Sequence, residues 1–233
     1  MKPVFKGDAP GGATTYKSAK PHLIARLGEH CSYCEAHRDP QDLHVEHIYP
    51  QKPHPEREND WENFLVACST CNSYKNIRLG NQRRRRLEDR YLWPHLDNTF
   101  RAYKYLEDGR VDLRPRLQDA VRKAADATRN MVGLTLTPAK VAKYRNLGIA
   151  YDGIDKRREQ WSITKGLRSS YLKKPSRLAA ERLARAAVKM GYFSIWMELF
   201  RDRIEVRREL IRAFRADPSC FDIRTKPRKK SRL

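Results

Sequence analysis

Apolar and polar positions follow two different patterns along the chain. Between residues 21 and 28, Leu23, Ile24 and Leu27 recur at helical spacing and predict a short helix. Residues 43–48 and 64–67 are short β-like runs and predict two strands. The section from residue 31 to 77 contains too few apolar residues to fold by hydrophobic burial alone, so the pattern favours stabilisation by a metal ion.

Beyond residue 79 the pattern becomes helical. Long charged segments carry apolar residues every three or four positions and predict helices over residues 117–131, 176–191 and 194–215. Thr137 and Pro138 are typical of the start of a further helix. The chain is therefore predicted to be α+β and mostly α, with a helical C-terminal region.

Two close cysteine pairs lie in the section that is poor in apolar residues. Cys31 and Cys34 form one CxxC pair, and Cys68 and Cys71 form the other. Each pair can place two thiolates on one tetrahedral ion, so the four residues predict a structural Zn²⁺ site. A four-thiolate site is closed to further ligands, and any chemistry is therefore expected elsewhere.

The charge of the chain indicates a polyanionic partner. Its 233 residues include 49 Lys and Arg against 28 Asp and Glu, a formal net charge of +21. Nucleic acid is favoured over a membrane, because no long helix separates a basic face from a broad apolar one. The run Arg83, Arg84, Arg85 and Arg86 is either a solvated helix face or a clamp on a nucleic-acid backbone.

The sequence carries no membrane signal. No stretch reaches the ~20 apolar residues of a membrane span, and the start MKPVFKGDAPGG lacks the apolar core of a signal peptide. We therefore expect a cytoplasmic protein with no membrane partner. In that compartment, metal binding explains the cysteines better than disulfides do.

Three motifs give residues 31–75 a family resemblance. CSYCE, VEHIYPQ and WENFLVACSTCNSYK, in this order, resemble the HNH endonucleases, the ββα-metal family of nucleases. The segment is most similar to the HNH nuclease subunit of Septu antiphage defence systems, as are the flanks YLWPHLDN, YKYLEDGRV and FSIWMELFRDR. Many HNH proteins have Asp, a second histidine and leucine where this chain has Glu46, Asn72 and Phe64.

The resemblance implies a fold and a domain order. A zinc-stabilised ββα-metal HNH core would precede a helical region that supplies substrate contacts and the surface for an ATPase partner. We expect an irregular N-terminal arm (1–20), a zinc-bound HNH nuclease domain (21–82), a helical domain (83–225) and a basic, disordered tail (226–233).

The residue types of the motifs suit hydrolysis of a phosphodiester bond. That reaction needs a base to activate water and a Lewis acid to neutralise developing charge. His47, with an ordinary pKa of about 6.5, is the predicted general base. Glu46 and Asn72 offer oxygen donors for a catalytic Mg²⁺ or Mn²⁺. Adjacent strand residues point to opposite faces, so Glu46 and His47 can meet at one phosphate only at a strand end or a distortion.

Two more residues are predicted to support the site. Asn63, grouped with the catalytic residues, stands at the start of the second strand, where its amide is expected to tie down the loop around His47. Lys75, three residues after Asn72, is expected to contact a phosphate oxygen. A helix turns about 100° per residue, so Cys71 can face the zinc while Asn72 faces the cleft.

Two classes of function fit these observations. The leading hypothesis is a metal-dependent HNH endonuclease acting on nucleic acid, with DNA favoured, in antiphage defence with an ATPase partner. The alternative is a non-catalytic, zinc-stabilised nucleic-acid-binding module, which gives His47 no task. A third, weaker hypothesis is a nuclease that stays silent until a partner docks.

Overall fold

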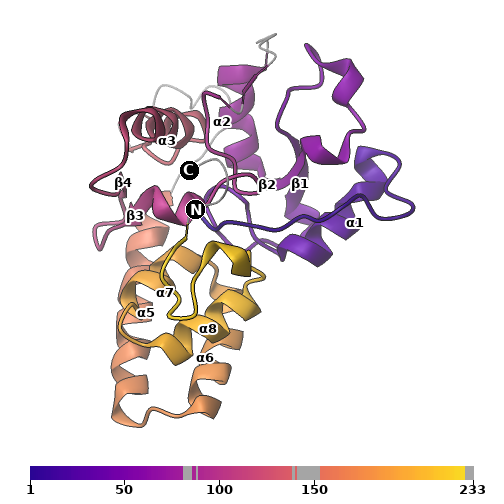
Figure 1. The fold of residues 1–233 in the computed structure, drawn as a ribbon. Helices are drawn as coiled ribbons and strands as arrows, with labels where there is room; N and C mark the ends of the chain where they lie inside the picture. Colours follow the sequence, from indigo (N-terminus) through magenta and orange to yellow (C-terminus); the bar gives the residue numbers. More distant parts are fainter. Residues whose placement is uncertain (81–85, 88, 138–139, 141–152, 229–233) are drawn as a thin grey trace.

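The computed structural model describes residues 1–80, 86–87, 89–137, 140 and 153–228 (Figure 1). Its helices are α1 (Tyr16–Leu27), α2 (Ser69–Leu79), α3 (Asp119–Met131), α5 (Gly153–Lys173), α6 (Arg177–Met190), α7 (Phe193–Leu199) and α8 (Ile204–Ala213). Its strands are β1 (Leu43–His47), β2 (Phe64–Cys68), β3 (Tyr103–Tyr105) and β4 (Val111–Leu113). The strands form two antiparallel hairpins, β1 with β2 and β3 with β4. The predicted α+β, mostly α fold is confirmed.

The hairpin of β1 and β2 continues into α2 as a ββα unit. His47 at the end of β1 pairs with Phe64 at the start of β2, and Leu43 pairs with Cys68. α2 starts directly after Cys68 and packs against both strands, as does α1. All residues of β2 are buried, so both faces of the hairpin are covered. The two strands predicted from the β-like runs are confirmed.

The C-terminal part is a helical bundle. α5, α6, α7 and α8 lie together below the ββα unit in the view of Figure 1, and α6 packs along α8. A buried cluster that includes Phe193, Trp196 and Phe214 fills the space between these helices. The helices predicted over residues 117–131 and 176–191 are confirmed as α3 and α6.

The N-terminal arm connects the two halves. Val4 is fully buried and forms a β-bridge with Ala216. Lys2 Nζ donates hydrogen bonds to the carbonyl of Leu27, at the end of α1, and to that of Phe214, just after α8, at 2.7 and 2.6 Å. One buried lysine therefore holds the C-terminal ends of α1 and α8 together.

The start of α1 differs from the prediction. The helix begins at Tyr16, because Thr15 and Ser18 form a capping box. The Ser18 backbone N–H donates to Thr15 Oγ1 at 3.2 Å, and the Thr15 backbone N–H donates to Ser18 Oγ at 3.0 Å. The prediction took Pro21 as the first helical residue, whereas Pro21 lies inside the helix.

Two other expectations were wrong. The single helix predicted over residues 194–215 is two helices, because the chain turns between the end of α7 at Leu199 and the start of α8 at Ile204. The first residues of the tail predicted to be disordered, 226–228, are ordered, since Arg228 N donates to the Cys220 carbonyl at 2.7 Å. Residues 229–233 lie outside the described residues, as do Pro138 and most of the helix predicted after it.

Candidate functional site

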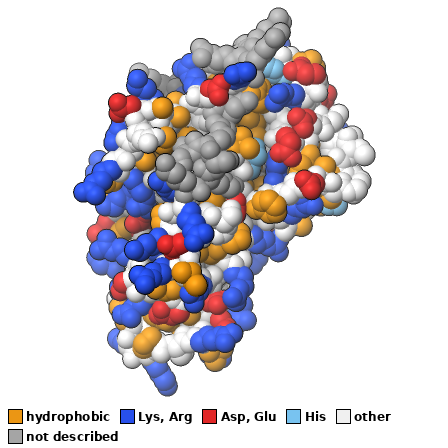
Figure 2. All heavy atoms as spheres, in the orientation of Figure 1, with side chains coloured by type: hydrophobic (Ala, Val, Ile, Leu, Met, Phe, Trp, Pro, Cys, Tyr) orange, Lys and Arg blue, Asp and Glu red, His pale blue; other side chains and the backbone are white. Residues whose placement is uncertain are grey.

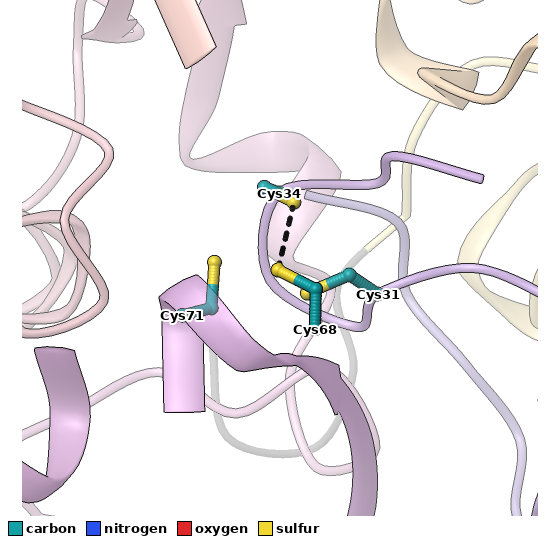
Figure 3. A group of neighbouring side chains, drawn as sticks. All are labelled: Cys31, Cys34, Cys68 and Cys71. Atoms are coloured by element: carbon teal, nitrogen blue, oxygen red, sulfur yellow. Dashed lines mark hydrogen bonds between the residues drawn. The ribbon is translucent and has the colours of Figure 1, made fainter. Parts of the chain in front are cut away.

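The four cysteines of the two CxxC pairs come together at one end of the ββα unit (Figure 3). Cys31 and Cys34 lie in the turn between α1 and β1, Cys68 ends β2, and Cys71 lies in the first turn of α2. Their Sγ atoms all lie within 4.8 Å of one another, and those of Cys34 and Cys68 are 3.9 Å apart.

This sulfur geometry fits a zinc ion. Tetrahedral zinc with Zn–S bonds of about 2.3 Å places its sulfurs about 3.8 Å apart. Hydrogen bonds from the other three cysteines hold the pKa of the Cys68 thiol far below its ordinary value, whereas burial raises that of Cys31. The cluster already favours a thiolate at Cys68, and the four residues could therefore hold the predicted structural Zn²⁺.

Glu46 lies on the face of β1 that packs against α2, and it is buried in an ion pair. Its side chain is 1% exposed, and its Oε1 accepts a bond of 2.6 Å from Lys75 Nζ and one of 3.1 Å from the Tyr33 hydroxyl. Burial raises the pKa of Glu46, and the Lys75 ammonium opposes that shift. Burial also raises the pKa of Tyr33, which keeps its hydroxyl protonated as a donor.

Lys75 does not lie where the sequence analysis placed it. Its side chain is fully buried, and its Nζ binds both Glu46 and the backbone carbonyl of His47. A contact with phosphate is not compatible with this position, because the ammonium is enclosed and its partners are already within the protein. Lys75 instead fastens α2 to the end of β1.

His47 faces the side of β1 opposite to Glu46, as strand geometry requires. Its ring packs edge-on against Tyr16 of α1 and Phe64 of β2, with centroids 5.4 and 5.2 Å away. His47 Nε2 lies 2.9 Å from the Glu58 carbonyl, so Nε2 carries the proton and donates it. Nδ1 has no hydrogen-bond partner among the described residues and is left as the basic nitrogen.

The environment of His47 favours the neutral imidazole. Burial lowers its pKa below 6.5, although the hydrogen bond to the Glu58 carbonyl opposes this shift. At neutral pH the ring therefore holds a lone pair on Nδ1 and is ready to accept a proton.

Asn63 ties down the loop between the strands, as its position in the sequence suggested. Its Oδ1 accepts from the Tyr49 backbone N–H at 2.7 Å, and its Nδ2 donates to the carbonyls of Tyr49 and Arg57 at 3.1 and 2.9 Å. Its grouping with catalytic residues needs correction, because the whole amide is used within the protein. Asn63 is a positioning residue for the loop that brings the Glu58 carbonyl to His47.

Asn72 lies on α2, one turn before Lys75, and is partly exposed. Residues three apart share a helix face, so Asn72 lies on the side of α2 that faces β1. Its Oδ1 accepts a bond of 3.1 Å from Asn76 Nδ2. No hydrogen bond among the described residues joins Asn72 to Glu46 or His47, and the predicted pairing of Glu46 and Asn72 on one metal ion stays a proposal.

The arginine run falls mostly on residues whose structure is not described. Arg83, Arg84 and Arg85 lie outside the described residues, and Arg86 is exposed. The role of the arginine run as a clamp on a nucleic-acid backbone stays a prediction. The predicted domain boundary between residues 82 and 83 stays a prediction too.

Two contributors to the site were missed in the sequence. Tyr33 is part of the CSYCE motif, but nothing in its spacing indicates a bond to a residue of β1. Tyr16 lies well before the motifs, and only the packing of α1 against the hairpin brings its ring to His47.

A β-hairpin followed by a helix, fastened by four cysteines and carrying a histidine at the end of its first strand, defines a ββα-metal unit. The protein-family comparison agrees, because the family described as HNH endonuclease matches residues 31–78, about a fifth of the chain. This match supports the HNH family in general, and with it a metal-dependent nuclease and a nucleic-acid substrate. No curated protein matches the chain. Among the described residues, no helix is both long and apolar enough to cross a membrane.

Proposed function

We propose that the chain is a metal-dependent HNH endonuclease that hydrolyses phosphodiester bonds in nucleic acid, with DNA as the favoured substrate. The observation that carries the proposal is the state of His47. Its Nε2 proton is fixed on the Glu58 carbonyl, 2.9 Å away, which leaves a neutral ring with a free Nδ1.

The residues of the site divide the work. His47 Nδ1 takes the proton from the attacking water, and the Glu58 carbonyl stabilises the imidazolium that forms. Asn63 holds the loop that carries that carbonyl. Glu46 and Asn72 would hold Mg²⁺ or Mn²⁺, which would neutralise charge on the phosphate when bound. Because Glu46 is buried beside Lys75 and faces away from the His47 ring, this role requires the ion pair to open and the end of β1 to turn, so that both residues reach one phosphate.

The biological setting is part of the proposal. The similarity of the motifs and their flanks to the Septu group supports a cytoplasmic role in antiviral defence beside an ATPase subunit. The buried pair of Glu46 and Lys75 supports a restrained enzyme, since an ammonium occupies one oxygen of a proposed metal ligand. A docked partner would then be needed for full activity, and the ATPase is the candidate.

The alternative function is a zinc-stabilised module that binds nucleic acid without cutting it. The net charge of +21 and the cysteine cluster suit both functions equally well. The two differ only in whether His47 does chemistry.

The experiment is a cleavage assay on plasmid, linear duplex, single-stranded DNA and RNA, with Mg²⁺ or Mn²⁺ added or withheld. His47→Ala is the matched control, after zinc content and circular dichroism have shown that it folds. Metal-dependent nicking by the parent and not by His47→Ala supports the nuclease. Binding without nicking by either protein, with and without a co-purified ATPase subunit, supports the module instead.

A further inference from the structure

α8 carries a row of arginines that the proposed active site does not use. Arg208 and Arg212 are four residues apart and share one face of the helix, and Arg215 follows two residues after its end; all three are exposed and line one groove. Within the part of the chain that the structure describes, Arg212 pairs with Glu209 at 2.9 Å, and no ion pair is found for Arg208 or Arg215. Lys and Arg side chains are also dense over the lower half of the face in Figure 2, where the helical bundle lies.

These arginines line one wall of a groove with a volume of about 560 Å³, a size typical of ligand pockets. The opposite wall is the segment after α8, where Ile223 is 77% exposed, and Ile211 and Phe221 also line the groove. Arg208 fastens the two walls together, because its guanidinium donates to the Ile223 carbonyl at 2.8 Å. The groove thus joins a cationic rim to an apolar lining.

One acidic residue, Asp222, lines the groove beside the three arginines, so the charge of the lining stays positive. Asp222 Oδ1 is used inside the turn of the opposite wall, where it accepts the backbone N–H groups of Arg224 and Lys226, each at 2.8 Å. The side chains of Arg224 and Lys226 are themselves exposed and add to the charge beside the groove. An anion is therefore the complementary occupant.

Arg215 is held in a conformation that non-glycine residues rarely adopt, with φ of 53°. The bond from Ala216 N to the Ile211 carbonyl, 3.0 Å long, closes the end of α8 around it. Glycine is the usual residue at such a position, so an arginine there carries a backbone cost that its side chain must offset.

Two neighbouring grooves on the helical half, both lined by Trp161, have a more balanced charge. There Lys165 pairs with Glu107, and Arg168 pairs with Asp202. Acidic and basic side chains line each of these grooves in equal number, whereas three arginines and one acid, Asp222, line the α8 groove. The α8 groove is a better anion site than either of them.

The groove stands at a fixed distance from the proposed active site. Tyr16, at the start of α1, contacts the ring of His47, and Leu27, at its end, shares Lys2 with Phe214, just after α8. α1 has 12 residues and is about 18 Å long, so His47 and the groove lie near opposite ends of this helix.

We propose that the α8 groove, formed by Arg208, Arg212, Arg215 and the wall at Ile223, is a second nucleic-acid site. The arginines bind backbone phosphates away from the cleaved bond, and the apolar lining contacts a sugar or a base. The proposal rests on the nuclease function, since it gives that enzyme a second substrate-binding site outside the active site. The net charge of +21 favours nucleic acid over an acidic polypeptide, because a strand offers a regular row of phosphates together with sugars and bases.

The test is a binding titration of labelled 30-nucleotide DNA, single-stranded and duplex, over a range of salt concentrations without added Mg²⁺ or Mn²⁺. The test variant is Arg208→Gln/Arg212→Gln/Arg215→Gln, with Arg208→Gln/Arg212→Gln as a milder form. The matched control, Arg177→Gln/Arg182→Gln/Arg185→Gln, removes three exposed charges from α6. Each phosphate contact contributes about 0.9 to the slope of log affinity against log salt for duplex DNA.

We expect the α8 triple variant to lower that slope by about 2 to 3 and the double variant by about 2, while the α6 control changes it by less than about 1. An unchanged slope in the α8 variants, or equal changes in the α6 control, would overturn the proposal. So would displacement of DNA by polyglutamate at equal charge concentration. Because binding is measured without cleavage, loss of the groove effect and loss of nuclease activity are separate outcomes.

Discussion

The buried pair of Glu46 and Lys75 gives the most specific stability prediction. The two side chains are 1% and 0% exposed and 2.6 Å apart, so water does not screen their attraction. Lys75→Met removes the ammonium but keeps most of the side-chain volume. It leaves a buried carboxylate whose remaining hydrogen-bond donor is the Tyr33 hydroxyl.

Breaking a buried pair from one side costs about 3–5 kcal/mol, because the remaining charge is neither hydrated nor paired. We expect Lys75→Met to lower the free energy of unfolding by that amount. Glu46→Gln, which leaves the ammonium with the His47 carbonyl, should cost about 2–4 kcal/mol. The double variant should fall within about 2 kcal/mol of the parent, because it buries no charge and the new amide still accepts from Tyr33.

Urea denaturation of the zinc-loaded parent, both single variants and the double variant gives the coupling energy directly. We expect at least about 3 kcal/mol. A coupling energy below about 0.5 kcal/mol would refute the reasoning, since an exposed lysine gives such a value. The salt dependence of DNA binding is a second readout. If Lys75→Met lowers the slope of log affinity against log salt by about 0.9, Lys75 contacts a phosphate, as the sequence first predicted.

Three further predictions concern the loop, the cysteine cluster and the N-terminal arm. Asn63→Ala removes three buried hydrogen bonds and should cost about 2–4 kcal/mol, with faster hydrogen exchange at the Tyr49 amide; unchanged exchange would contradict this. Cys71→Ser should lose zinc by elemental analysis and lose its cooperative thermal transition, whereas a cooperatively folded, zinc-free variant would oppose a structural ion. Burial lowers the pKa of Lys2 from 10.5 to about 7. Between these two pH values the unfolded state binds more protons than the folded state. The free energy of unfolding should therefore rise with pH in this range, by up to about 1.4 kcal/mol per pH unit. Lys2→Met should flatten the rise in urea titrations between pH 7 and 10, and an equal slope in both proteins would reject the assignment.

Much of the ββα unit could be predicted because its information is local. The spacing of each CxxC pair restricts the sulfur positions whatever the rest of the chain does, and the four Sγ atoms meet as expected. The two β-like runs pair as β1 and β2, with His47 opposite Phe64. The position of Asn63 is also informative locally. It lies directly before β2, which restricts its amide to the loop between β1 and β2.

The part that could not be predicted depends on long-range packing. From the sequence, a lysine three residues after Asn72 could equally be a solvent-exposed cation or the buried partner of a carboxylate. Lys75 pairs with Glu46 only because α2 packs closely against β1. The contact of Tyr16 with His47 joins residues 31 positions apart through the docking of α1. The turn at residues 200–203 has no strong breaker and follows from the packing of α7 and α8 within the bundle.

The central claim is that His47 is the general base of a nuclease. The most direct measurement is the single-turnover rate of Mg²⁺-dependent nicking of supercoiled plasmid by the parent and by folded, zinc-loaded His47→Ala. We predict that the variant is slower by about 10²–10⁴-fold, the usual contribution of a general base. Equal rates for the two proteins would contradict the account and place the chemistry elsewhere in the chain.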